Sequence, residues 1–130
     1  MNNKQNIFFY LKVLENHFPV VDQKVPLKKK KRIVLKSNFE SGFSIPYYSF
    51  KKEPEIAVIK NGAVSLNLSL FRSGVVVSQG QVLHGEDGFS APECCLKVGD
   101  YGSLRLGRLQ ILIKVAKENP KYIVKRKAPR

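Results

Sequence analysis

A run of five consecutive cations, residues 28–32, is the feature of this sequence with the clearest chemical use. The run follows Pro26 and Leu27 and leads directly into the apolar residues 33–35. Clustered lysines neutralise backbone phosphates and release counterions, which gives an affinity that falls steeply with salt and does not depend on base sequence. Because the run enters a strand-like segment, we expect a scaffold to hold these cations in place.

A second basic segment, residues 105–130, holds nine cations against the single acid Glu118, and residues 24–36 hold seven cations and no acid. The whole chain has a net charge of +13, so the positive charge is concentrated in these two segments. The phosphate contacts that we predict in them are Lys28, Lys29, Lys30, Lys31, Arg32, Lys36, Arg105, Arg108, Lys114, Lys125, Arg126 and Lys127. Lysine mostly contacts phosphates whereas arginine more often reads bases, so we expect little sequence specificity.

Several other uses of these side chains remain open. Residues 28–32 behind Pro26 resemble the single-cluster nuclear-localisation signal that importins read. The same cations would suit an anionic membrane surface, an acidic protein, or a solvated loop that only keeps the protein soluble. An aromatic-rich run could stack on unpaired bases, but such runs more often pack in a core or along an edge strand. Its members are Phe43, Tyr47, Tyr48 and Phe50.

Cys94 and Cys95 are the candidate nucleophiles, with His84 as a base and Glu86 or Asp87 to orient it. No strand-to-helix elbow accompanies them, and adjacent cysteines lack the usual spacing of zinc ligands. We therefore predict no enzymatic activity, no metal site and no cofactor. Adjacent cysteines rarely bridge each other, so we expect free thiols in a reducing intracellular compartment, with a nuclear or virion-associated setting as options.

The elements that must position these residues are mostly strands. A length of 130 residues fits one domain, residues 1–130, with a basic segment at 24–36 and a basic tail at 116–130. Short apolar runs between turn signals predict an all-β fold, an antiparallel sandwich or barrel of about seven to nine strands. Residues 7–18 fit either a strand or an N-terminal helix, and β-propensity favours the strand. Charges within this apolar stretch argue against a signal peptide and a membrane span.

Several local expectations follow. Asn61-Gly62 predicts a hairpin, and the alternation over residues 64–70 predicts a half-buried strand. A change of alternation at Gly107-Arg108 predicts a β-bulge. Further expectations are a connector bracketed by Pro19 and Pro26, strands at 32–37, 75–77 and 122–124, and a long acidic loop at 84–102 with a short strand at 94–98.

These patterns predict a non-enzymatic, nucleic-acid-binding structural or assembly protein of the viral coat, matrix or ribonucleoprotein-scaffold type. Its mechanism would be sequence-independent neutralisation of RNA or DNA phosphates. We expect homo-oligomers in which the acidic loop of one copy meets the basic strand of the next. The alternatives are a membrane-surface or acidic-protein interaction module and, third, a cysteine-dependent enzyme.

Overall fold

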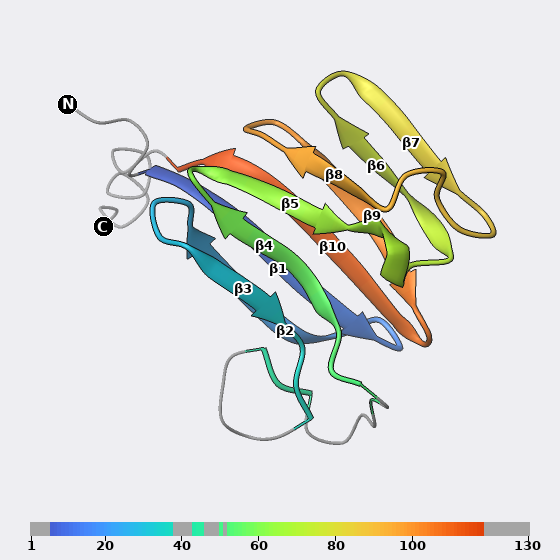
Figure 1. The fold of residues 1–130 in the computed structure, drawn as a ribbon. Helices are drawn as coiled ribbons and strands as arrows, with labels where there is room; N and C mark the ends of the chain where they lie inside the picture. Colours follow the sequence, from blue (N-terminus) through green and yellow to red (C-terminus); the bar gives the residue numbers. More distant parts are fainter. Residues whose placement is uncertain (1–5, 38–42, 46–49, 51, 119–130) are drawn as a thin grey trace, which may run out of the picture.

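The chain folds as a β-sandwich of two antiparallel sheets, and this confirms the predicted fold class (Figure 1). The structure, a computed structural model, describes residues 6–37, 43–45, 50 and 52–118. It has ten strands, slightly more than the seven to nine expected, and the segment assigned to a connector between Pro19 and Pro26 is one of them.

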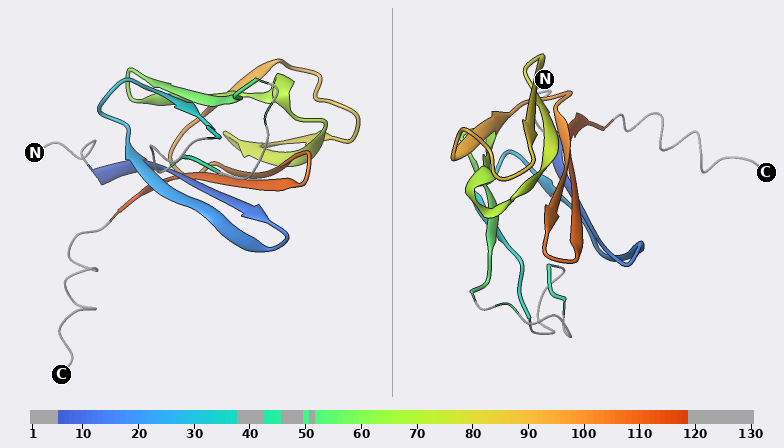
Figure 2. Two further views of the ribbon diagram at one scale, coloured as in Figure 1. Left: turned by 90° about the horizontal axis from the view of Figure 1, so that it is seen from below. Right: turned by 90° about the vertical axis from the view of Figure 1, so that its right-hand side faces the viewer.

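The larger sheet has six strands and the smaller sheet has four, and Figure 2 shows the two layers face to face. The order in the larger sheet is β2 (Phe18–Pro26), β1 (Ile7–Glu15), β10 (Leu109–Lys117), β9 (Tyr101–Leu106), β6 (Ser73–Ser78) and β7 (Gln81–Gly85). The order in the smaller sheet is β3 (Lys31–Val34), β4 (Glu55–Lys60), β5 (Ala63–Asn67) and β8 (Glu93–Leu96). A short 3-10 helix, η2 (Leu68–Leu70), follows β5.

The hydrophobic core lies between the sheets and comes from alternate residues of their strands. In β1 the side chains of Phe9, Leu11 and Val13 are buried, and in β10 those at 109, 111, 113 and 115 are buried. The period of two and the pairing of β1 with β2 and β10 show that residues 7–15 are a strand, so the alternative of an N-terminal helix is wrong. The intervening residues of β1 and β10 therefore form part of the outer face of the larger sheet.

The hairpin predicted at Asn61-Gly62 is confirmed. Lys60 pairs with Ala63, and the two turn residues have φ angles of 55° and 75°, as a two-residue turn of the primed type requires. The bulge predicted at Gly107-Arg108 is wrong, because these residues form the turn between β9 and β10, with Leu106 opposite Leu109. A two-residue turn offsets the alternation by one residue, which is the pattern that suggested the bulge.

Three other expectations change in detail. The strand predicted over residues 64–70 ends at Asn67, where the Ser69 hydroxyl donates a 2.6 Å hydrogen bond to the Asn67 side chain and η2 begins. Pro19 and Pro26 lie within β2 rather than in a connector, and β2 tolerates prolines because it is at the edge of its sheet. The long loop at 84–102 contains β8 and the start of β9, so its irregular parts are residues 86–92 and 97–100.

The connection from β8 to β9 is held by the buried side chain of Asp100, which is 6% exposed. One carboxylate oxygen accepts the amide of Lys97 at 2.8 Å, and the other accepts the amide of Gln79 at 3.0 Å. Asp100 thus ties the turn between β6 and β7 to the connection that joins the two sheets. The predicted strand at 122–124 lies outside the described residues.

Candidate functional site

One end of the sandwich is formed by the start of β1 and the end of β10, which pair at Ile7 and Lys117. The connections from β2 to β3 and from β8 to β9 and the hairpin between β4 and β5 lie at the same end, as the strand directions in Figure 1 show. We call this the basic end. Its described cations are Lys24, Lys28, Lys29, Lys30, Lys31, Lys60, Lys97, Lys114 and Lys117, and its described acids are Asp100 and Glu118.

The other end of the sandwich, which we call the opposite end, has balanced charge among the residues that the structure describes. Its cations are Lys36, Lys52, Arg72, Arg105 and Arg108, and its acids are Glu15, Glu53, Glu86, Asp87 and Glu93. Two ion pairs lie between the ends, Lys12 with Asp22 at 4.0 Å and Arg32 with Glu55 at 2.7 Å. The net positive charge of the described chain therefore lies at the basic end.

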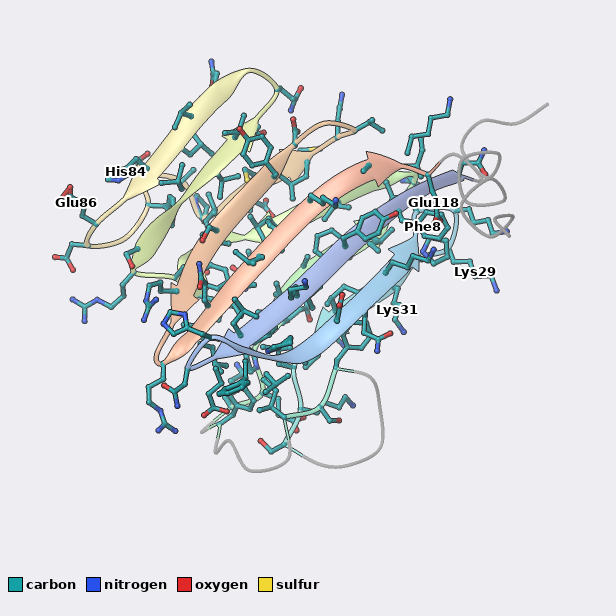
Figure 3. All side chains as sticks on the ribbon, turned by 180° about the vertical axis from the view of Figure 1, so that it is seen from behind. Phe8, Lys29, Lys31, His84, Glu86 and Glu118 are labelled. Carbon is teal, nitrogen blue, oxygen red and sulfur yellow. The ribbon has the colours of Figure 1, made fainter. Side chains whose placement is uncertain are left out.

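Lys24 anchors the basic end. Its ammonium donates to both carboxylate oxygens of Glu118, at 2.8 and 2.9 Å, and lies 4.8 Å from the centre of the Phe8 ring. The hydrogen bond to Glu118 is the main cause that raises the pKa of Lys24. Figure 3 shows Phe8, Lys29, Lys31 and Glu118 gathered at this end, with His84 and Glu86 far from them.

A row of alternating lysine and tyrosine crosses the outer face of the larger sheet near the basic end. Lys24 in β2 is opposite Tyr10 in β1, Tyr10 is opposite Lys114 in β10, and Lys114 is opposite Tyr101 in β9. The Lys114 ammonium lies 5.0 Å from the centre of the Tyr10 ring. Cations at such distances over a ring are attracted by its electron-rich face, so the two side chains hold each other in place.

Burial raises the pKa of the Tyr10 phenol, and the charge of Glu118 adds to the rise while Lys24 opposes it. Tyr10 is half-buried, whereas Tyr101 is 55% exposed. A phenol of ordinary pKa is already protonated at neutral pH, and the rise moves ionisation to still higher pH, so the Tyr10 hydroxyl is a hydrogen-bond donor. The row therefore presents two tyrosine rings and two lysine side chains.

Of the predicted contacts, Lys28 to Lys31 lie exposed at the basic end, and Lys114 belongs to the row. Arg32 is instead paired with Glu55, and Lys36 lies beyond β3 in an isolated bridge to Ser44. A shallow depression of about 690 Å³ runs beside β3. Its lining residues are Lys31, Arg32, Val34, Lys36, Phe43, Lys52 and Glu53.

Arg105 and Arg108 lie at the opposite end, so the structure separates them from the first cluster. Arg108 is 3.6 Å from the carboxylate of Glu15, and both arginines border a depression of about 170 Å³ beside His17. Leu109 and Lys117 are eight positions apart in β10, which is about 26 Å of strand. The predicted contacts Lys125, Arg126 and Lys127 lie outside the described residues.

The aromatic run predicted to stack or pack is half-buried where it is described, since Phe43 and Phe50 pack against the core. Tyr47 and Tyr48 lie outside the described residues. Sequence reasoning missed the basic-end lysines at 60, 97 and 117 and the outer-face aromatics Phe8, Tyr10 and Tyr101. The alternation of residues 7–13 was a usable signal, because it places Phe8 and Tyr10 on the face opposite Phe9 and Leu11.

The candidate nucleophiles and their candidate base belong to different sheets. His84 is an exposed residue of β7 in the larger sheet, while Cys94 and Cys95 are in β8 of the smaller sheet. Asp87 accepts a 2.7 Å hydrogen bond from Arg72, which lowers the pKa of its carboxyl. Burial raises the pKa of the Cys94 thiol to about 11, so little of it is thiolate at neutral pH. Both cysteines are free thiols.

Within 6–37, 43–45, 50 and 52–118, no group of three or more His, Cys, Asp or Glu is placed to hold a metal ion. In the same part of the chain, no helix has the length and apolar character needed to cross a membrane.

No family model matches this chain, and no curated protein or solved structure matches it.

Proposed function

We propose that this protein binds nucleic acid without catalysis, as a structural or assembly component, by neutralising backbone phosphates at its basic end. The observation that supports the proposal is that the described residues of that end include nine cations and only two acids. One of the acids, Asp100, is buried and bound to backbone amides, and the other, Glu118, is bound by Lys24. Lysines in such a cluster suit phosphates of any base sequence.

The sequence that follows Glu118 adds to this charge. Residues 119–130 contain five further cations and no acid, and the chain enters them at Glu118, beside Lys24. Each phosphate that is neutralised releases counterions, so the contacts add to one steep dependence on salt. Lys125, Arg126 and Lys127 therefore stay part of the proposed interface through their place in the chain.

Exposed apolar side chains lie at both ends of the sandwich, so an anionic membrane is the competing partner: Val98 and Tyr101, 51% and 55% exposed, lie at the basic end. A membrane-surface site combines cations with large apolar side chains that enter the lipid boundary. Phe18, which at 72% is the most exposed of the large apolar side chains described, lies at the opposite end. On the outer face, Tyr10 lies between Lys24 and Lys114, and Tyr101 lies between Lys114 and Val77.

The test is a salt titration of binding to duplex DNA and to single-stranded RNA. We expect the logarithm of the binding constant to fall steeply as salt rises from about 50 to 200 mM. Replacing Lys28, Lys29 and Lys30 by Gln should reduce the slope by about two to three for the duplex, since each lost phosphate contact removes about 0.9.

The matched control replaces Lys52, Arg105 and Arg108 by Gln, which removes the same charge from the opposite end. This control should keep most of the slope of the unmodified protein. A binding constant that hardly changes with salt would contradict the proposal. Flotation with anionic liposomes but no retention of nucleic acid would assign the basic end to a membrane surface.

We also propose that copies assemble through unlike charges. Glu86 and Asp87 follow β7, and Glu93 begins β8, so three acids lie at the opposite end from the basic end. A contact between this acidic loop of one copy and the basic end of the next would place acids against lysines, and complementary charge sets orientation. Sedimentation should then show larger species at low salt than at high salt; one salt-independent monomer would contradict it.

A further inference from the structure

We propose that the row Lys24–Tyr10–Lys114–Tyr101 is a binding site for unpaired nucleobases, which makes single-stranded nucleic acid the ligand of the outer sheet face. This inference rests on the proposed function and adds a second kind of contact to it. The basic end supplies charge for the phosphates of any strand. The row supplies ring faces on which the bases of a single strand stack.

The spacing of the row matches such a ligand. Neighbouring strands are about 4.8 Å apart, so the two tyrosines, and likewise the two lysines, are about 10 Å apart across the sheet. Each ring therefore has an ammonium group on a long, flexible side chain next to it. A base on either ring can keep its own phosphate within reach of a lysine.

A shallow hollow of about 310 Å³ lies beside Tyr10 on this face. Its lining residues are Tyr10, Leu11, Lys12, Asp22, Leu112, Ile113 and Lys114. The volume is at the lower limit of small-ligand sites, and apolar walls with a few charged groups at the rim are typical of them. The Asp22 carboxylate, 71% exposed, can accept a hydrogen bond from an exocyclic amino group of a base.

The exposure of the rings argues against a purely structural role. Tyr101 is 55% exposed on a strand that is third from the edge, so the ring does not contribute to the core. Tyr10 is only half-buried. The centre of the Phe8 ring lies 6.2 Å from the centre of its ring, with 55° between the ring planes, and the Lys114 ammonium lies 5.0 Å from the ring centre. Base stacking on such a ring tolerates any sequence, because every base has a π face. Duplex bases hide those faces inside the stack, so the row selects single strands.

The test compares three labelled oligomers of about 12 nucleotides: a single-stranded homopolymer, a duplex of the same length, and an abasic strand that keeps the phosphates. Replacing Tyr10 and Tyr101 together by Ala should weaken binding of the single strand at least about fivefold for each ring removed. The duplex and the abasic strand should bind with unchanged affinity. Replacing both by Phe keeps the rings and should retain tight binding.

The matched control is Phe18→Ala, which removes an exposed ring from the opposite end and should leave binding of the single strand unchanged. Far-ultraviolet circular dichroism checks folding, and Tyr101→Ala alone serves if the double variant unfolds, because Tyr101 is exposed. Equal losses for the base-bearing and abasic strands would overturn the inference. No loss of binding at all would also overturn the inference. The proposed function would still stand if the variant with Lys28, Lys29 and Lys30 replaced by Gln bound every oligomer more weakly. Absence of binding to all three would overturn both.

Discussion

The two ends of this sandwich differ in charge although the same strands run through both. At the basic end, the lysines come from four separate chain segments and face few acids. Among the described residues of the opposite end, cations and acids are equal in number, and Arg72 and Arg108 contact Asp87 and Glu15 respectively. Net charge alone does not describe a binding surface, since its placement on the fold decides what it meets.

The largest effect that we expect comes from reversing charge at one end only. Replacing Lys28, Lys29 and Lys30 by Glu should weaken nucleic-acid binding about 100-fold or more near 0.1 M salt, because attraction becomes repulsion where the phosphates bind. Replacing Lys52, Arg105 and Arg108 by Glu changes net charge equally and should weaken binding much less. Fluorescence anisotropy measures both, and equal losses would show that only net charge matters.

The next effect concerns how the basic end is held together. Asp100→Ala leaves the amides of Lys97 and Gln79 without their acceptor, and a hydrogen bond to a charged group contributes about 1.5–3 kcal/mol. We expect the free energy of unfolding to fall by about 2–4 kcal/mol in a urea titration. Asp87→Ala at the opposite end removes an exposed ion pair and should hardly change the urea concentration at the midpoint of unfolding. Similar losses for the two variants would contradict the role given to Asp100.

A smaller effect is expected at the hairpin of the basic end. Gly62 has a φ of 75°, and a Cβ there would meet no atom within 4 Å. Gly62→Ala should therefore cost only the backbone strain of a positive φ, about 1 kcal/mol, with nucleic-acid binding unchanged. Chemical denaturation measures the change in stability, and the salt titration measures nucleic-acid binding. Loss of binding without loss of stability would mean that the hairpin itself contacts the ligand.

The smallest effect separates the two cysteines and leaves the fold unchanged. Burial raises the pKa of Cys94 to about 11, so at pH 8 only about 0.1% of that thiol is thiolate. Cys95 is exposed. Iodoacetamide at pH 8 should therefore label Cys95 first, and labelling of Cys94 should rise as the pH approaches 11. Peptide mass spectrometry reads both sites, and faster labelling of Cys94 would contradict the burial argument.

Local features of the fold could be predicted because their cause is local. Asn61-Gly62 tolerates the positive φ values of a two-residue turn, and the alternation in residues 109–115 follows from one buried face. The end of β5 at Asn67 was missed, since a hydrogen bond between two polar side chains competes with the strand there. The turn at Gly107-Arg108 was misread because a bulge and a tight turn both shift the period by one residue.

The row could not be predicted, because it depends on which strands become neighbours. Lys24 and Lys114 are ninety positions apart in the sequence, and both are opposite Tyr10 only because β1 lies between β2 and β10. Alternation assigns each residue to a face but gives no strand order. For the same reason, the sequence grouped Arg105 with Lys114, whereas the antiparallel hairpin carries Arg105 to the opposite end.

The hydrogen bond from the Glu118 amide to the Asn6 carbonyl, 2.7 Å long, has a practical consequence for protein engineering. It brings the first and last described residues together at the basic end. A circular permutant that opens the chain at Gly107-Arg108 would place its new termini, and an affinity tag or fluorophore attached to them, at the opposite end of the sandwich. Such a permutant would let binding be measured on an unobstructed surface.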